Sequence, residues 1–219
     1  MKMKSKFTIA LATTAAVASS VYTVPAEAVT MPFTDVKNEG KDVELYKAVT
    51  ELYSKGIVFG TSSTQFSPYN TITRGEAAAF LAKALQLKTD NVENPNFKDV
   101  PTSHKYYKEI AALAANSIID KDRENYDPNG VFRRSHVAKM LTLGFNLDKS
   151  TELTAKFTDF TPTKETNIYI QTLVDYGITE GTTATTFSPN GSLTRKQMTL
   201  FLYRTMQKLE DDFYIVSVE

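Results

Sequence analysis

The sequence contains no cysteine and only two histidines among its 219 residues. Without cysteine no disulfide can brace the chain, so a secreted form must be held together by its apolar core alone. Common zinc sites are built largely from cysteine and histidine, and His104 and His136 offer little from which to build one. A G-x-S-x-G nucleophile motif is also missing. We therefore expect no metal, no cofactor and no enzymatic activity.

A strong net charge is also absent, because 25 basic residues balance 25 acidic residues. Leaving out the first 28 residues removes three Lys and one Glu, and 22 basic and 24 acidic residues remain. A near-neutral surface provides no electrostatic basis for binding nucleic acid or an anionic membrane. After the N-terminal segment, no apolar run is long enough to cross a bilayer.

Residues 1–28 have the pattern of a secretory signal peptide. Three lysines precede an uncharged, Ala-rich apolar stretch, and Ala26 and Ala28 supply the small residues that a signal peptidase reads. Cleavage after Ala28 predicts a secreted chain that begins at Val29. The alternative is an N-terminal membrane anchor, against which the Thr and Ser residues of the stretch argue.

Three copies of one unit follow this segment. Each copy opens with F-x-D and an apolar residue, at Phe33, Phe97 and Phe157. A proline-centred block then ends in an arginine six residues after the proline, at Arg74, Arg134 and Arg195. We place the repeats at 29–90, 91–150 and 151–209. For the tail at 210–219 three interpretations stay open: a strand, a partner contact or the start of a longer protein.

Each copy is expected to contain two helices. In the first, apolar residues lie about one turn apart, as in Val49, Leu52 and Tyr53. This helix should stop at Gly56 in copy one and at Gly177 in copy three, because glycine suits a left-handed C-terminal cap. The fold class is therefore all-α.

The second helix should begin near the arginine, and its apolar pattern is the clearest in the chain. Positions three, six, seven and eleven after the arginine are apolar in every copy, which predicts one buried stripe. The stripe comprises Ala77, Phe80, Leu81 and Leu85; Val137, Met140, Leu141 and Phe145; and Met198, Phe201, Leu202 and Met206. Position ten is small, Ala84, Gly144 or Thr205, so that another helix can approach.

The start of this helix has a local cause in two of the copies. Thr73 with Glu76, and Thr194 with Gln197, match the capping box, in which each residue of the pair satisfies a backbone amide of the other. Copy two has His136 at the last position of the box and an arginine at the first. Its helix start should be weaker by about 1 kcal/mol.

These blocks resemble the S-layer homology repeat of bacterial surface proteins. The resemblance extends from Phe33 to about Leu209 and rests on the F-x-D-V, G-I-x-x-G and I-T-R-G-E motifs. It implies three helix-loop-helix repeats in a compact pseudo-threefold bundle, with grooves between neighbouring repeats. It also implies a secreted protein of the bacterial cell wall or S-layer, anchored non-covalently through secondary cell-wall polysaccharide, which typically carries pyruvate ketals.

The resemblance further implies which residues contact or shape the polysaccharide grooves. The arginines of the T-R-x-E motif become ligand contacts, at Arg74, Arg134 and Arg195. The aspartates of F-x-D-V and the glycines of G-I-x-x-G shape or line the grooves, at Asp35, Asp99, Asp159, Gly60 and Gly181.

Elementary chemistry supports an anion at these arginines. A cation in the first turn of a helix is mildly repelled, so its recurrence suggests that the arginine and free backbone amides converge on an anion. A planar guanidinium can clamp one carboxylate with two hydrogen bonds. The alternative is that each arginine pairs with an F-x-D-V aspartate. Those aspartates also suit a capping role at the first helix or its lead-in loop.

Copy two departs furthest from the pattern. Ser117 and Lys121 replace its two glycines. A groove that needs close backbone approach at the second glycine would be altered or closed there. We therefore expect unequal grooves, with fewer than three in use.

Other interpretations stay open. Tyrosines provide flat faces for sugar rings, and the candidates are Tyr46, Tyr53, Tyr69, Tyr106, Tyr107 and Tyr169. A secreted cell-wall hydrolase is one functional alternative, because carboxylates are plentiful enough for a glycosidase pair. An adapter that docks S-layer or other surface proteins is another.

Overall fold

The structure is a computed structural model that describes residues 31–161 and 163–216. The predicted signal peptide lies outside these residues. The described chain forms six α-helices and no named strand, which confirms the all-α prediction. The helices are α1 (Val43–Ser54), α2 (Arg74–Ala84), α3 (Tyr107–Ala115), α4 (Arg134–Gly144), α5 (Lys164–Asp175) and α6 (Arg195–Val216), with a short 3₁₀ helix, η1, at Gly40–Asp42. Among these residues, none of the helices is both long and apolar enough to span a membrane.

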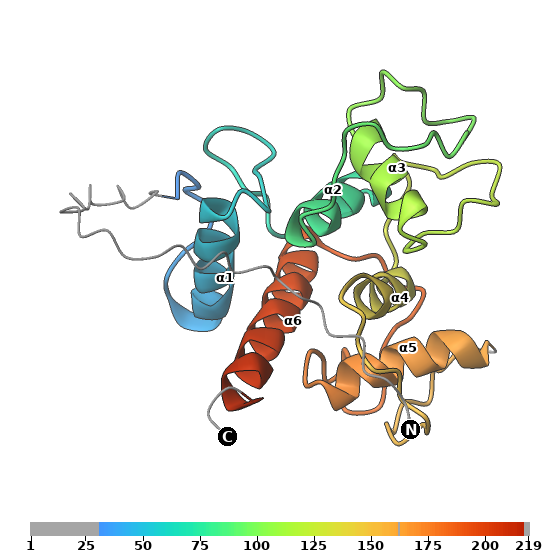
Figure 1. Ribbon diagram of the computed structural model, residues 1–219. Helices are drawn as coiled ribbons and strands as arrows, with labels where there is room; N and C mark the ends of the chain where they lie inside the picture. The colour runs from blue at the N-terminus through green and yellow to red at the C-terminus, as the bar shows by residue number, and fades with distance from the viewer. Residues whose placement is uncertain (1–30, 162, 217–219) are drawn as a thin grey trace, which may run out of the picture.

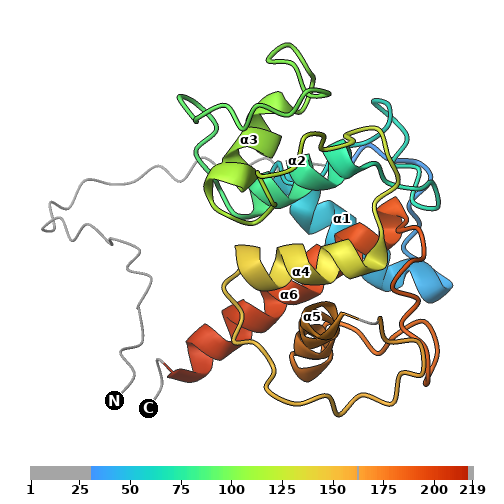
Figure 2. The ribbon, with the colours of Figure 1, turned by 90° about the vertical axis from the view of Figure 1, so that its right-hand side faces the viewer.

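The helices pair across the boundaries of the sequence repeats. The second helix of one repeat packs on the first helix of the next, giving the pairs α2/α3 and α4/α5 (Figure 1). The third pair, α6/α1, joins the two ends of the described chain and closes the arrangement into a ring. Figure 2 shows α4 crossing α6, and the long C-terminal helix contacts α2 and α4 as well as α1.

Three backbone hydrogen bonds tie the repeats together at the centre of this ring. The amide of Ile72 donates to the carbonyl of Leu193 at 3.0 Å, Leu193 donates to Phe132 at 2.8 Å, and Phe132 donates back to Ile72 at 3.2 Å. All three side chains are buried. The cycle uses one equivalent residue from each repeat, and it is the local expression of the predicted pseudo-threefold symmetry.

The predicted stripe of the second helices forms the core. Positions three, six and seven are buried in all three repeats, and position eleven packs partly buried against them. The small residue at position ten allows close approach, as expected. A Cβ added at Gly144 would lie 2.8 Å from Leu85 Cδ1 of the first repeat.

Ion pairs reinforce the pair α6/α1, where no chain connection links the two helices. Arg204 donates two hydrogen bonds of 2.7 Å to the carboxylate of Glu44. Lys196 Nζ lies 2.5 Å from Asp42 Oδ1. The C-terminal segment is helical as far as Val216, where α6 ends. The strand interpretation of the tail is therefore wrong over residues 210–216.

A left-handed residue ends the first helix of every repeat, as predicted for Gly56 and Gly177. Gly56 and Gly177 have φ of 68° and 66°, and Ser117 occupies the same conformation at 57°. Each directs the next amide back to the helix, as in the 2.8 Å bond from Ile57 to the Leu52 carbonyl. A side chain in this conformation meets its own backbone, so repeat two carries a local strain that the others avoid.

Replacing Ser117 with glycine should raise the free energy of unfolding by about 1 kcal/mol, because glycine adopts positive φ without this penalty. Urea unfolding of the variant and the parent measures the difference. The matched control is Gly56→Ala, which adds a methyl group in open space at the same cap. It should lower stability by about 1 kcal/mol. Equal midpoints for all three proteins would contradict the strain.

Candidate functional site

The aspartate of each F-x-D opening holds the proline-centred loop of its own repeat. Asp35 accepts hydrogen bonds from the amides of Phe66 and Ser67, at 2.8 and 2.7 Å. Asp99 and Asp159 hold their own loops through the same pair of bonds. The second amide in each loop belongs to a residue with positive φ, Ser67, Asp127 or Ser188. The carboxylate thus fixes an otherwise unfavourable turn.

This arrangement corrects two expectations for Asp35, Asp99 and Asp159. None is the N-cap of a first helix, because Asp42, Tyr106 and Thr163 hold those positions. Within the described chain, none forms an ion pair with an arginine of the T-R-x-E position. The aspartates shape the loops that the arginines enter.

Each of the three arginines inserts into the loop of the next repeat. Arg74 Nε donates to the Tyr126 carbonyl at 2.8 Å, and its guanidinium lies 4.6 Å from the centre of that ring. Arg134 makes the same contacts with Phe187, and Arg195 makes them with Phe66 of the first repeat. We call these contacts junction 1–2 (Arg74), junction 2–3 (Arg134) and junction 3–1 (Arg195).

The first backbone amides of the second helices also belong to the junctions. Arg74 N donates to the Gly130 carbonyl at 3.0 Å and Gly75 N to the Pro128 carbonyl at 2.8 Å. The same pair of bonds recurs at the starts of α4 and α6. The expectation that free amides join the arginine in binding an anion is therefore wrong, since neighbouring carbonyls already occupy them.

Junction 3–1 encloses its arginine. Arg195 is 1% exposed, and its three nitrogens donate to the carbonyls of Phe66 and Phe59 and, at 3.2 Å, to Glu76 Oε1. Burial lowers the pKa of Arg195, while Glu76 acts in the opposite direction. The same Glu76 closes the capping box with Thr73 at the start of α2. At this junction the arginine has a structural role, and the carboxylate of Glu76 is its counter-ion.

Junction 2–3 is similarly closed. Arg134 is 5% exposed and lies against the rings of Phe187 and Phe201, at 4.7 and 5.4 Å. Burial lowers its pKa to about 10, and nearby Asp159 opposes this shift. Gln197, at the position equivalent to Glu76, exchanges hydrogen bonds with Thr194 as a capping box does.

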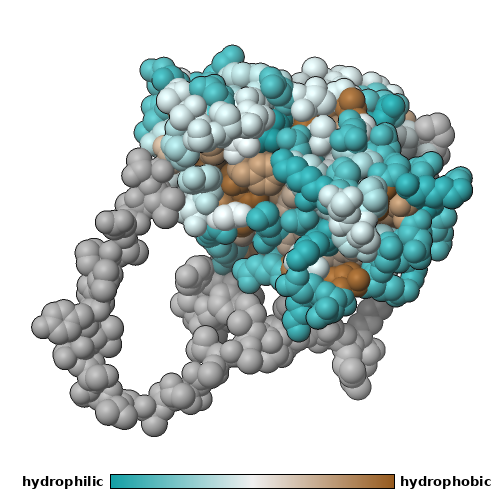
Figure 3. Space-filling view, turned by 90° about the horizontal axis from the view of Figure 1, so that it is seen from above, coloured by the Kyte–Doolittle hydropathy of each residue, from teal (hydrophilic) through white to brown (hydrophobic). Residues whose placement is uncertain are grey.

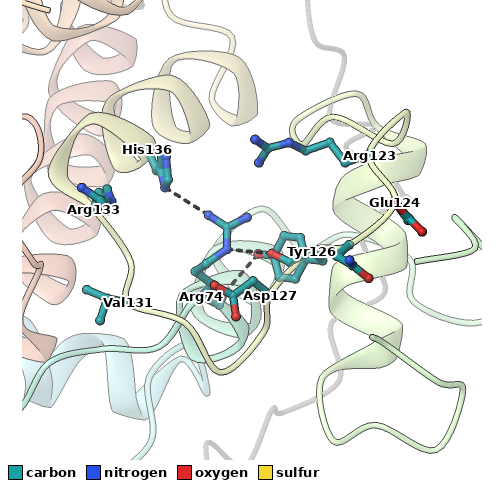
Figure 4. Close-up of a pocket in the computed structure, with 9 residues that line it drawn as sticks. Arg74, Arg123, Glu124, Tyr126, Asp127, Val131, Arg133 and His136 are labelled. Atoms are coloured by element: carbon teal, nitrogen blue, oxygen red, sulfur yellow. Dashed lines mark hydrogen bonds between the residues drawn. The ribbon is translucent and has the colours of Figure 1, made fainter. Parts of the chain in front are cut away.

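Junction 1–2 is open. Arg74 is only partly buried, and its Nη1 lies 3.0 Å from His136 Nδ1. Its guanidinium faces a pocket of about 710 Å³ between the first and second repeats, where His136 and Arg123 approach it from two sides (Figure 4). The pocket is lined by Arg74, Arg123, Glu124, Asn125, Tyr126, Asp127, Val131, Arg133 and His136.

Positive charge predominates around this opening. The pocket is lined by three guanidinium groups, those of Arg74, Arg123 and Arg133, and by two carboxylates. An adjoining hollow of about 260 Å³ adds one charge of each sign, from Lys139 and Asp120. One of the two carboxylates in the pocket, that of Glu124, is already paired with Lys98. A small anion that enters the pocket could accept hydrogen bonds from the Arg74 guanidinium, because the described residues accept only from its Nε and Nη1.

His136 is affected both by burial and by these positive charges. Burial, followed by the charges of Arg74, Arg133, Arg123 and Lys139, lowers its pKa to about 4. The ring is therefore neutral near pH 7. Since a guanidinium can only donate, Nδ1 accepts from Arg74 and the ring proton resides on Nε2.

The glycines at the end of G-I-x-x-G serve packing. A Cβ at Gly60 would overlap the Phe33 ring, and one at Gly181 would overlap the Phe157 ring. Neither glycine lines the open pocket. The second repeat has Lys121 in place of this glycine, and its loop borders the open pocket. Of the two expected outcomes, an altered or a closed groove, closure is therefore excluded here.

The tyrosine candidates separate by exposure. Tyr46, Tyr53, Tyr106, Tyr107 and Tyr169 pack in or against the core. Tyr69 is 59% exposed, and its hydroxyl donates to Asp42. The face in Figure 3 is largely hydrophilic, with apolar residues visible mainly in small hollows.

Arg123, Arg133 and His136 were not predicted as site residues. Two of them, Arg133 and His136, are the residues that replace the capping box in copy two. That departure was the available signal, but it indicated only a weaker helix start. Arg123 lies in a loop without a repeated motif, and nothing in the sequence marks it.

The depressed pKa of His136 predicts a specific acid sensitivity. Below about pH 6.5 the unfolded chain protonates this ring, whereas the folded chain does not until about pH 4. Stability is therefore full above pH 6.5 and falls by about 2 kcal/mol towards pH 4, after a discount for partial exposure. Urea unfolding of the parent and His136→Gln at pH 7 and pH 4.5 isolates this contribution. Identical losses in both proteins would contradict it.

Comparison with known proteins places these features in a family. A family model described as the S-layer homology domain matches residues 32–78, 96–138 and 156–199. Each match lies within one of the three repeats described above. The chain is also 31% identical, over 94% of its length, to the surface-layer 125 kDa protein of Lysinibacillus sphaericus. It is 30% identical, over 91% of its length, to an S-layer protein of Bacillus thuringiensis subsp. finitimus.

The shared region is a small part of these relatives. The chain spans 17% of the Lysinibacillus protein and 24% of the Bacillus protein. A similar region occurs in proteins with other names, such as exoglucanase XynX of Acetivibrio thermocellus, at 29% identity over 80% of this chain and 16% of that protein.

Proposed function

Because the chain belongs to the S-layer homology domain family, we propose that it anchors non-covalently to the bacterial cell wall. In this proposal it binds secondary cell-wall polysaccharide through the open pocket at junction 1–2 and does no chemistry on it. The protein is secreted after removal of residues 1–28. The recognised group is a pyruvate ketal, which presents one carboxylate on a sugar.

The observation that carries the proposal is the state of Arg74. It is the one member of the three equivalent arginines that faces a pocket of the described chain while remaining partly exposed. A carboxylate there could bond the guanidinium and gain attraction from Arg123 and Arg133. Sugar hydroxyls would find acceptors in Glu124 and Asp127, which line the same pocket.

The buried arginines take a different part in this proposal. A ligand carboxylate could reach Arg195 only by displacing Glu76 and the carbonyls that enclose it. Opening a buried charge network costs several kcal/mol, which a single weak sugar site would not recover. We therefore assign ligand contact to Arg74, and give Arg134 and Arg195 the task of holding the repeats together.

Arg74→Ala should weaken binding to purified pyruvylated wall polymer by about 2 kcal/mol, or roughly 30-fold, because a charge-assisted pair is lost. Co-sedimentation with walls, or calorimetry with a polymer fragment, measures the change. Lys83→Ala is the matched control, since it removes one exposed charge from α2 outside the pocket. Its affinity should equal that of the parent.

Polymer from which the ketals have been removed provides the second arm of this test. The parent should bind it about as weakly as Arg74→Ala binds the intact polymer. Unchanged binding after ketal removal would refute the carboxylate as the recognised group. Release of reducing sugar from either polymer would favour the hydrolase alternative.

A further inference from the structure

One helix position faces the arginine of the preceding repeat at two of the junctions. It is the third residue of the second helix, Glu76 in repeat one and His136 in repeat two. Arg195 Nη1 donates to Glu76 at 3.2 Å, and Arg74 Nη1 lies 3.0 Å from His136 Nδ1. The same atom of the arginine thus meets a carboxylate at junction 3–1 and an imidazole at junction 1–2.

The two partners leave their arginines in different electrostatic states. Glu76 accepts from the guanidinium and also supplies a compensating negative charge. His136 accepts a hydrogen bond at the same place but is neutral, so it orients the guanidinium without compensating its positive charge. The described residues accept from all three nitrogens of Arg195 but only from Nε and Nη1 of Arg74.

We propose that, at a junction whose arginine is exposed to a pocket, the residue at this position decides whether an anion binds, and that His136 keeps junction 1–2 competent. A carboxylate at the position acts as a built-in ligand that excludes an external one. A neutral acceptor orients the arginine and leaves its charge for the ligand. The proposal rests on the function proposed above and adds the residue that confines it to one junction.

Other groups around the pocket do not supply the missing charge. Glu124 pairs with Lys98. The remaining carboxylates, one on Asp127 and one on Asp120, are outnumbered by four cations, which are Arg74, Arg123, Arg133 and Lys139. No ion pair of Arg74 with a carboxylate is present in the described chain. The absence of Glu at position 136 therefore leaves this guanidinium without a direct counter-ion.

The decisive variant is His136→Glu, because it reproduces at junction 1–2 the residue found at junction 3–1. The new carboxylate can accept from Arg74 and from the amide of residue 133, as Glu76 accepts from Arg195 and from Thr73 N. The variant should bind pyruvylated polymer fragments at least 10-fold more weakly than the parent, while its melting temperature stays equal or rises. Loss of affinity together with preserved stability separates occlusion of the site from misfolding.

Gln197→Glu is the matched control. It adds the same charge at the equivalent position of repeat three, where the arginine of the preceding repeat is already enclosed. Its affinity should stay within twofold of the parent. If it lost as much affinity as His136→Glu, the effect would be general charge repulsion and the proposal would be overturned. His136→Gln adds no charge, so its loss should be at least threefold smaller than that of His136→Glu.

Arg74→Ala, measured in the same series, keeps the two levels of inference apart. If Arg74→Ala loses affinity and His136→Glu binds as the parent does, the selecting role of residue 136 is overturned and the anchoring site stands. If neither variant loses affinity, the site itself is wrongly placed. Loss in both, with Gln197→Glu unaffected, supports both proposals.

Discussion

The insertion of one arginine from each repeat into the loop of the next is the interaction on which the structure depends. The guanidinium and the first two helix amides satisfy carbonyl groups that the receiving loop cannot satisfy by itself. Each loop is in turn held in shape by its own aspartate. No repeat is complete alone, because its loop accepts hydrogen bonds from the preceding repeat while its own arginine donates to the following one. The ring of Ile72, Phe132 and Leu193 closes this dependence into a cycle.

This constraint explains why three similar arginines do different work. Burying a guanidinium costs free energy unless its donors are paired and its charge is compensated. Junction 3–1 meets both conditions, whereas junction 2–3 pairs Nε of Arg134 with one carbonyl and packs its guanidinium against two aromatic rings. Junction 1–2 pairs Nε and Nη1 of Arg74, which remains partly exposed, and His136 supplies no compensating charge. The binding site we propose thus lies where the repeat departs from its own pattern.

Local rules in the sequence predicted much of the fold. The stripe from Ala77 to Leu85 follows helical periodicity, and the caps at Gly56 and Gly177 follow backbone sterics, so both could be read without a partner. The pairing of helices across repeat boundaries could not be predicted in this way. It depends on contacts between residues more than a hundred positions apart in the sequence, such as Arg195 and Phe66.

The site was harder to predict for the same reason. Three arginines in equivalent positions look alike in sequence, and their burial is decided by residues of another repeat. His136 was visible as a departure from the capping box, but its position opposite Arg74 appears only when the repeats close on one another. For Asp35 the motif indicated a residue that shapes or lines a groove, or a cap, but not its partners, which are two loop amides that follow it by 31 and 32 residues.

The most direct measurement is nitrogen-detected NMR of the guanidinium groups during titration with a short pyruvylated fragment of the wall polymer. We expect the side-chain signals of Arg74 to shift on binding, while those of Arg134 and Arg195 stay in place because both side chains are buried. Equal shifts at all three arginines, or a shift confined to Arg134 or Arg195, would contradict this expectation.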